Sequence, residues 1–435
     1  MPKIISIQSF DVRFPTSKML DGSDAMNQDP DYSAAYLRIT TDQTGLHGDS
    51  LVFTIGRGND LQITAINILT SKIEGLDIDY AFANIGQIAR GLSGDSQIRW
   101  LGPDYGLFHM AAGAVLNALW DLFAKAKGVP LWKLLCELSP EQVVNSIDFR
   151  YITDALTPQE ALEILQKGEI SKRANEEVLL KKGLPAYTTS PGWLGYSDEK
   201  MLELTKRAIE EGFKLIKYKC GQSISDDRRR LKKVRELVGP DFLIAIDANQ
   251  VWDVNQAITW IDALKEYNLH WVEEPTSPND VLGHAKIAAS VAPTPIATGE
   301  MASSRIIFKQ LLQAKGFSVM QIDATRVAGV NENLANILMA AKFGVSVCPH
   351  AGGVGLCEMV QHLAIWDAVA VSGHHKSRVV EYVDHLHQHF IKPVQILDGN
   401  YMAPRQPGSG AEMLESSLNE YSFPSGTYWK NEVNA

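Results

Sequence analysis

The pattern of apolar and polar positions predicts a small mixed domain at the start of the chain. Residues 1 to about 60 alternate in KIISIQSFDVRF and AAYLRITTD, which predicts strands joined across a long Gly- and Asp-rich loop. From Asp60 to Lys127 apolar residues recur every three or four positions, which predicts helices, and Gly128 marks a helix end. Together the two patterns predict an α+β domain of about 130 residues.

Beyond this domain, strand-like runs alternate with helical patterns up to roughly residue 394, which is typical of βα units. From Lys219 onward, strand ends carry an ionisable residue every 23 to 31 residues, close to the length of one βα unit in a parallel barrel. Because such barrels hold their active sites at the carboxyl ends of the strands, the series predicts one composite site. Its members are Lys217, Lys219, Asp247, Glu273, Glu300, Asp323, His350 and Glu381.

Composition narrows the classes of function. The 435 residues carry a net charge of -10 with scattered Lys and Arg, so we expect no nucleic acid and no anionic membrane as a partner. We also expect no membrane span and no export leader, because no apolar run nears about 18 residues and the first residues read as a strand. Four cysteines without CxxC spacing favour buried free thiols and a cytoplasmic location.

Three of the acids predict a metal site. Asp247, Glu273 and Glu300 stand at the ends of successive predicted strands, where their carboxylates converge and would repel one another without a cation. A hard divalent ion with oxygen ligands removes this repulsion, and Mg²⁺ suits that ligand set. Any one acid alone would more often cap a helix or pair with a basic side chain, but three at matched intervals favour the metal.

The remaining strand-end residues predict acid–base chemistry. Lys217 and Lys219 are two apart on one strand, so both point to the barrel interior, and each lowers the pKa of the other toward that of a usable base. Asp323 and His350 predict a dyad in which the carboxylate fixes the imidazole tautomer. Glu381 would hydrogen-bond charge that develops on a substrate if it is held protonated, with a structural salt bridge as the alternative.

Two further patterns suggest ligands less strongly. The glycines of HAGGVG, residues 350–355, lack the strand, GxGxxG and helix order of a phosphate loop, so we expect them to leave room for a polar substrate. A group of histidines near the end of the predicted barrel has no convergent metal-ligand spacing, so we expect surface histidines. They are His374, His375, His385, His387 and His389.

The order of the strand-end residues resembles the enolase superfamily, specifically its mandelate-racemase-like subgroup. Long stretches are most similar to the L-fuconate dehydratases, among them GSDAMNQDPDYSAAY, QIRWLGP, EEPTSPNDVLGHAKI and PHAGGVGLCE. Fungal-type L-galactonate dehydratases share many of these stretches, and the two substrates differ by one hydroxyl. Tyr218, Cys220 and residues 302–304 depart from the pattern of relatives beside the site, where they bear on substrate preference.

The periodicity and the resemblance together imply an α/β fold. We expect a modified TIM barrel, (β/α)7β, over residues 131–395 with an N-terminal α+β capping domain over residues 1–130. A loop at about residues 15–35 would close over the site, as its length and Gly and Asp content also suggest. Residues 396–435 would form a tail packed on the capping domain. The resemblance gives no symmetry, but a homo-oligomer is expected.

The resemblance also implies an activity. It is a Mg²⁺-dependent hydro-lyase converting L-fuconate to 2-keto-3-deoxy-L-fuconate, with an L-galactonate dehydratase or a sugar-acid racemase or epimerase as alternatives. A non-catalytic binding protein is disfavoured because the constellation is complete. Lys219 would remove the C2 proton and Lys217 would tune it, while His350 or protonated Lys219 would serve the leaving 3-hydroxyl. The implied substrate contacts are Gly22, Ser23, Asp24, Tyr32, Lys217, Lys219, Asn249, His350 and Glu381.

Overall fold

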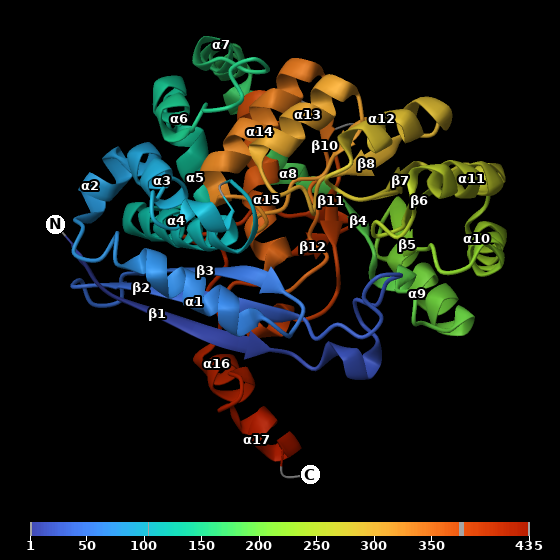
Figure 1. Cartoon of the computed structure of the whole chain (residues 1–435), viewed down its shortest axis with the longest axis horizontal. Helices are drawn as coiled ribbons and strands as arrows, with labels where there is room; N and C mark the ends of the chain where they lie inside the picture. Colours follow the sequence, from blue (N-terminus) through green and yellow to red (C-terminus); the bar gives the residue numbers. More distant parts are fainter. Residues whose placement is uncertain (1, 103, 374–377, 434–435) are drawn as a thin grey trace.

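The computed structural model describes residues 2–102, 104–373 and 378–433 and confirms the predicted α/β fold. A three-stranded antiparallel sheet with its helices lies beside a barrel of parallel strands whose helices form the outer ring (Figure 1). The first part contains β1 (Ile4–Arg13), β2 (Ser33–Thr41), β3 (His47–Thr54), α1 (Asn59–Thr70), α2 (Ile78–Ala83), α3 (Ile85–Ser93) and α4 (Gly106–Lys127).

The antiparallel sheet buries its central strand. Strand β2 pairs with β1 and β3 and is almost wholly buried, while α1 and α4 pack against the sheet. Helix α4 is, among the described residues, the one helix long and apolar enough to cross a membrane, yet most of it is buried inside the protein. Its apolar residues, such as Trp120 and Leu119, therefore build the core of this part of the molecule.

Eight parallel strands in the described residues build the barrel. They are β4 (Leu184–Thr188), β5 (Leu215–Lys219), β6 (Leu243–Asp247), β7 (Trp271–Glu273), β8 (Ile296–Thr298), β9 (Val319–Met320), β10 (Ser346–Val347) and β11 (Val380–Tyr382). Pairing runs in order from β4 to β10, and β11 pairs with β4. The backbone N–H of Glu381 donates to the carbonyl of Pro349 at 3.1 Å, which joins the last two strands and closes the ring.

Seven helices in the described part of the chain connect these strands. They are α9 (Asp198–Glu210), α10 (Ile224–Val238), α11 (Val254–Leu264), α12 (Val281–Ser290), α13 (Arg305–Ala314), α14 (Gly329–Phe343) and α15 (Leu356–Trp366). Polar caps start several of them, because Ser197, Ser223, Asp253 and Asp280 each accept a hydrogen bond from a backbone N–H of the first turn.

Strand register places the charged residues next to one another. Lys219 lies opposite Asp247, and Asp247 lies opposite Glu273, across β5, β6 and β7. Lys217 points to the same face one step deeper, as the two-residue period of a strand requires. Apolar side chains fill the barrel below this layer, so the charged residues rest on a packed floor made by Tyr187, Leu215, Ala245, Trp271 and Ala297.

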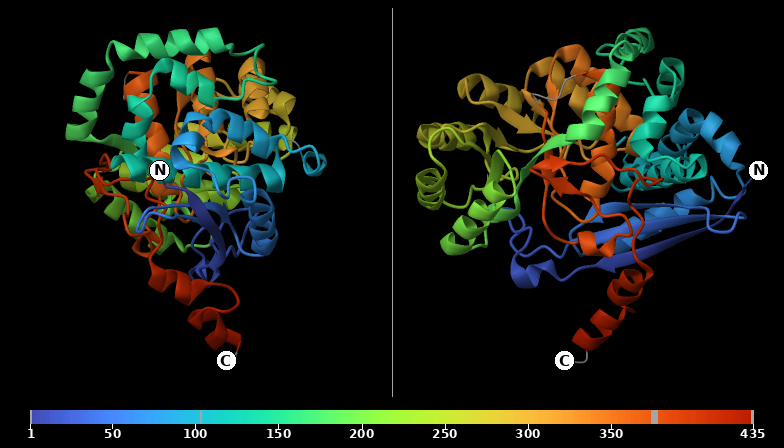
Figure 2. Two further views of the ribbon diagram at one scale, coloured as in Figure 1. Left: turned by 90° about the vertical axis from the view of Figure 1, so that its left-hand side faces the viewer. Right: turned by 180° about the vertical axis from the view of Figure 1, so that it is seen from behind.

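The remaining segments link the two parts of the molecule (Figure 2). Helices α5 (Leu131–Glu137), α6 (Pro140–Ser146), α7 (Pro158–Glu169) and α8 (Lys172–Lys182) precede the barrel, and β12 (Ile396–Leu397), β13 (Asn400–Tyr401), α16 (Glu415–Tyr421) and α17 (Thr427–Val433) follow it. Strand β13 pairs with β4, and the N–H of Phe423 donates to the carbonyl of Asp11 at 2.7 Å. The tail therefore returns from the barrel to β1.

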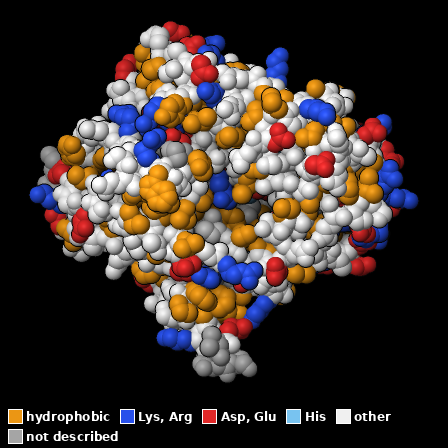
Figure 3. Space-filling model, viewed as in Figure 1, with side chains coloured by type: hydrophobic (Ala, Val, Ile, Leu, Met, Phe, Trp, Pro, Cys, Tyr) orange, Lys and Arg blue, Asp and Glu red, His pale blue; other side chains and the backbone are white. Residues whose placement is uncertain are grey.

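The surface and the cysteines agree with the composition. On the face drawn in Figure 3, acidic and basic side chains are interspersed rather than gathered into one field of either sign. All four cysteines are buried, as predicted: Cys136, Cys220, Cys348 and Cys357.

Candidate active site

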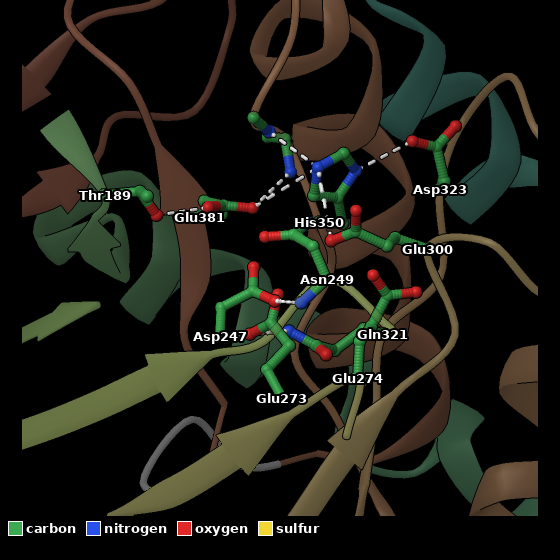
Figure 4. Close-up of polar contacts among 12 residues, drawn as sticks. Thr189, Asp247, Asn249, Glu273, Glu274, Glu300, Gln321, Asp323, His350 and Glu381 are labelled. Carbon is green, nitrogen blue, oxygen red and sulfur yellow. Dashed lines mark hydrogen bonds and ion pairs between the residues drawn. The ribbon is translucent and has the colours of Figure 1, made fainter. Parts of the chain in front are cut away.

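Three buried carboxylates meet at the mouth of the barrel. Asp247 and Glu273 end β6 and β7, and Glu300 lies just beyond β8; each offers an oxygen within 4.8 Å of the other two. Their side chains face a common space (Figure 4). One oxygen of Glu300, Oε2, is buried without a hydrogen-bond partner in the described residues. An all-oxygen cluster with an unsatisfied buried atom fits a hard divalent cation such as Mg²⁺.

The two lysines of β5 lie against these acids. Lys217 contacts Glu273, and its ammonium is 3.0 Å from Glu381 and 3.3 Å from Asp247. The ammonium of Lys219 donates to Asp247 Oδ2 at 2.6 Å. Both side chains are buried, so each is held by charge pairing rather than by water.

The predicted lowering of the lysine pKa values is wrong for this arrangement. Burial disfavours the charge of Lys219 and Lys217 lowers its pKa further, but Asp247, Glu300 and Asp24 together outweigh both, so the pKa of Lys219 is raised. Glu273 and Glu381 likewise outweigh burial and raise the pKa of Lys217 well above its usual value. The spacing of Lys217 and Lys219 showed that they were neighbours, but it did not reveal that each also has an acid within hydrogen-bond reach.

His350 and Asp323 form the predicted pair. Asp323 Oδ2 lies 2.8 Å from His350 Nδ1, and Asp323 Oδ1 accepts the N–H groups of Thr325 and Arg326 at 2.6 and 2.9 Å. The other ring nitrogen lies 3.5 Å from Glu300 Oε2, so the imidazole faces the acidic cluster. Burial opposes a charged imidazole, yet Glu300 and Asp323 outweigh it and raise the pKa of His350 to about 9.

Glu381 completes the ring in its ionised form. It accepts hydrogen bonds from the Thr189 hydroxyl and from the N–H of Ala351, the latter at 3.0 Å. Burial would raise its pKa, but Lys217, His350 and Lys219 outweigh burial and lower it to about 2. The expectation of a protonated Glu381 is therefore wrong here, because three cationic side chains surround the carboxylate.

Some residues of the site escaped sequence reasoning. Glu274, which follows Glu273 in WVEEP, is fully buried and accepts from Gln250 Nε2 at 2.8 Å, and burial raises its pKa well above the usual value. Gln321 donates to Glu273 Oε2 at 2.7 Å and orients that carboxylate. The adjacent second Glu of WVEEP was a visible signal, whereas a lone Gln immediately after the short strand β9 gave none.

Asn249 and the glycine segment stand around the charged residues. The backbone N–H of Asn249 donates to Asp247 Oδ1 at 2.9 Å, and its side-chain Oδ1 is buried without a hydrogen-bond partner. A side chain added at Gly352 would begin 3.0 Å from His350 Nε2, so this glycine keeps the space beside the imidazole clear. That placement agrees with room for a substrate.

The capping loop reaches the site through some of its predicted contacts. Asp24 is buried and near enough to Lys219 to raise its pKa, and Tyr32 is buried with Gly22 packed against its ring. Ser23 is occupied by the loop itself, because its hydroxyl donates to the Leu20 carbonyl at 2.6 Å and accepts from the Gly195 N–H at 3.0 Å. Asp24 and Tyr32 are therefore better placed than Ser23 to meet a substrate.

The expectation of surface histidines is wrong for part of the group. His389 is buried, the Nε2 atom of His385 is buried, and His387 contacts Glu358 Oε1 at 2.6 Å. These residues follow β11 and are covered by distant segments: His389 packs against Tyr421 of α16, and His385 against Tyr32 and Trp193. Linear context therefore did not reveal their cover. His374 and His375 lie outside the described residues.

Sequence comparisons identify the family. Residues 200–417 match the family described as enolase C-terminal domain-like. Mitochondrial enolase superfamily member 1 of Xenopus laevis is 51% identical over 99% of this chain and 98% of its own length. The L-galactonate dehydratase of Hypocrea jecorina is 47% identical over 98% of this chain and 96% of its own length. The chain belongs to the enolase superfamily.

Solved structures agree with the fold and the metal site. The crystal structure of human mitochondrial enolase superfamily member 1 matches with a TM-score of 0.98 and 48% identity, covering 100% of this chain and 99% of that one. L-Talarate/galactarate dehydratase from Salmonella typhimurium, solved with Mg and L-lyxarohydroxamate, matches with a TM-score of 0.74 and 25% identity over 97% and 93%. A magnesium-bearing relative and the acidic triad of this chain both agree with the predicted cofactor. Neither of the sequence relatives described above is named an L-fuconate dehydratase, so that part of the resemblance stays a prediction.

Proposed function

We propose that the protein is a Mg²⁺-dependent sugar-acid dehydratase, a hydro-lyase, acting on L-fuconate to give 2-keto-3-deoxy-L-fuconate. The observation that carries the proposal is the arrangement of Lys219 and the His350–Asp323 pair around one acidic cluster. The cluster of Asp247, Glu273 and Glu300 would hold the ion. When bound, Mg²⁺ would offset the three negative charges and polarise the substrate carboxylate, which lowers the cost of removing the C2 proton.

The side chains supply the proton transfers. Asp247 keeps the pKa of Lys219 raised in this structure, and a divalent ion held by Asp247 would offset that carboxylate and favour the neutral amine. Neutral Lys219 would then take the proton from C2, and the electron pair of the broken C–H bond would move toward the carboxylate. The bond from C3 to its hydroxyl then breaks, and the hydroxyl leaves as water after receiving a proton from His350 or from protonated Lys219. Asp323 holds Nδ1 of His350 at 2.8 Å and its Nε2 faces the acidic cluster, and this geometry supports His350 as that acid. The resulting enol becomes the 2-keto-3-deoxy acid.

Lys217 and Glu381 act on the position of these groups. Lys217 is buried between Glu273 and Glu381, where its charge balances carboxylates that otherwise repel the substrate carboxylate. Glu381 is fixed by Thr189 and by the Ala351 N–H, so it can orient His350 Nε2, which lies 3.8 Å away.

L-Galactonate is the alternative substrate, because the L-galactonate dehydratase of Hypocrea jecorina is 47% identical to this chain. A racemase or epimerase is the alternative reaction, since it would use the same Lys219 and His350 without loss of the 3-hydroxyl. Product analysis separates the reactions. A keto acid trapped by semicarbazide supports dehydration, whereas loss of optical rotation without a keto product supports racemisation.

Substitution of the base tests the mechanism. Lys219→Ala should abolish keto-acid formation from L-fuconate and L-galactonate while the protein still binds Mg²⁺, because Lys219 is not one of the three clustered carboxylates. Keto-acid formation would be followed in a screen of six-carbon sugar acids with Mg²⁺, and metal binding by calorimetry. Turnover retained by Lys219→Ala would exclude Lys219 as the base.

A further inference from the structure

Two aromatic rings beside the proposed base each carry a buried nitrogen without a hydrogen-bond partner. Trp193 is 2% exposed and its Nε1 is unpaired; the Nε2 of His385 is buried and unpaired as well. Native proteins pair nearly all buried polar atoms, because an unpaired one loses the hydrogen bond it made to water. Within a substrate site, the missing partner is expected to be a group of the ligand.

These rings continue outward from the catalytic lysine. The Trp193 ring lies 5.5 Å from the ammonium of Lys219, measured to the ring centroid. The His385 ring lies 6.1 Å from that of Trp193 and 5.5 Å from that of Tyr32, which belongs to the capping loop. Trp193, His385 and Tyr32 therefore form a continuous surface, the aromatic wall, that runs from Lys219 to the capping domain.

The aromatic wall is held rigidly from behind. Arg230 of α10, itself 5% exposed, donates to the carbonyl oxygens of Gly192, Trp193 and Leu194 at 3.0, 3.2 and 3.1 Å. The N–H of Asp384 donates to the Ser190 hydroxyl at 2.9 Å, which joins the segment of His385 to that of Trp193. Fixed side chains of this kind are what a recognition surface needs, because they lose little freedom on binding.

The two nitrogens offer the hydrogen bonds that a hydroxyl group can match. The indole N–H of Trp193 is a donor only. Burial lowers the pKa of His385, so its imidazole is neutral and presents one donor and one acceptor. A hydroxyl both donates and accepts, whereas a methyl or methylene group would leave both nitrogens unpaired.

We propose that Trp193 and His385 hydrogen-bond hydroxyl groups of the substrate beyond C3 and thereby select polyhydroxy acids. The proposal rests on the proposed function, which places C2 of the sugar acid at Lys219. Since the aromatic wall extends away from Lys219, it meets the part of the carbon chain that does not react. Binding energy from that part would orient the substrate for proton removal.

A binding cycle between protein and ligand tests the contact. The Lys219→Ala variant is used because it prevents turnover. Calorimetry with Mg²⁺ would measure its affinity for L-galactonate and for the 4-deoxy, 5-deoxy and 6-deoxy forms of that acid. The 6-deoxy form is L-fuconate. Trp193→Phe and His385→Phe would each be added to Lys219→Ala. In Lys219→Ala, we expect loss of the contacted hydroxyl to weaken binding about 10- to 100-fold. In the double variant that lacks the ring nitrogen contacting that hydroxyl, we expect the same loss to weaken binding less than about threefold.

A hydroxyl is coupled to a ring nitrogen when its loss no longer weakens binding once that nitrogen is removed. The carbon that carries the coupled hydroxyl also addresses substrate choice. Coupling at C6 would support the proposal and favour L-galactonate over L-fuconate, whereas coupling at C4 or C5 would support it and allow both acids. The control is His270→Phe, because His270 is exposed at the start of β7, at the opposite end of the barrel, and should couple to no hydroxyl. His385→Phe keeps the test open if Trp193→Phe fails to fold.

Two failures are distinguishable. In the first, the acids bind, but removal of each hydroxyl weakens binding by the same factor with and without the ring nitrogens. The aromatic wall then does not recognise hydroxyls, and this proposal is overturned while the proposed function stands. If neither the wild-type protein nor Lys219→Ala binds any of the four acids, the proposed function falls and the proposal falls with it.

Discussion

At the scale of single residues, the contact of Asp323 with His350 makes a mechanistic prediction. Asp323→Asn keeps the size of the side chain but removes the charge that helps to raise the pKa of His350. We expect kcat for keto-acid formation to fall about 100-fold or more, with a smaller change in KM, because the imidazole loses its orienting carboxylate. Steady-state kinetics measure both constants. The control is Asp262→Asn on the exposed side of α11, and an unchanged kcat for Asp323→Asn would contradict the dyad.

The residues visible in the sequence were those whose chemistry depends on position along a strand. Asp247 and Glu273 could be predicted from matched intervals, since parallel strands bring their carboxyl ends together. The charge states of Lys219 and Glu381 could not, because a pKa depends on all the charges within a few ångströms in space. Unpaired nitrogens such as Trp193 Nε1 were invisible for the same reason, since they are defined by what surrounds them.

At the scale of elements, β5 places the buried ammonium of Lys217 beside carboxylates from three other strands. Lys217 is fully buried and contacts carboxylates of β6, β7 and β11. Lys217→Met should lower the free energy of unfolding by about 3 to 5 kcal/mol without metal, because buried carboxylates lose their partner. Mg²⁺ should restore part of this loss, since a divalent ion supplies positive charge to the same acids.

Urea unfolding with and without Mg²⁺ measures this effect. Lys214→Met is a matched control, because Lys214 is exposed immediately before the same strand and should change stability by less than about 0.5 kcal/mol in either condition. Equal losses for the two variants, or a loss in Lys217→Met that Mg²⁺ leaves unchanged, would contradict the charge-balancing role of Lys217.

The order and type of the elements were predictable because each repeats a local rule. Strands such as β5 and β6 end in charged residues, and helices such as α9 and α11 begin at polar capping residues that can be recognised in the sequence. The segment after β11 shows where such rules end. Its histidines read as exposed, but His389 packs against Tyr421 of the tail, His385 against Tyr32 and Trp193, and His387 against Glu358 of α15. These contacts between distant segments have no local signature.

At the scale of the whole molecule, a buried charged network joins the first domain to the barrel. Arg305 of α13 donates to Asp104 at 3.0 Å and to Glu332 of α14 at 3.1 Å, and His109 of α4 lies 2.6 Å from Glu332. The sequence held no sign of it, because Asp104 and His109 lie 201 and 223 residues from Arg305 and Glu332, their respective partners. A homo-oligomer and a cytoplasmic location remain predictions. Light scattering would measure the oligomeric state, and imaging in cells would test the location.

This network should make the stability of the molecule depend on acid pH. Burial would raise the pKa of Glu332, but His109 and Arg305 outweigh it and lower the pKa to about 2, against 4.5 for a free side chain. Because the folded-state pKa is the lower one, the stabilisation is complete above pH 4.5 and is lost as the pH falls toward 2. Glu332→Gln should lower the free energy of unfolding at neutral pH by about 3 kcal/mol, and the gap to wild type should narrow over that acid range. Urea unfolding at several pH values measures the gap, and a difference that stays constant from neutral pH to the lowest value would contradict this role.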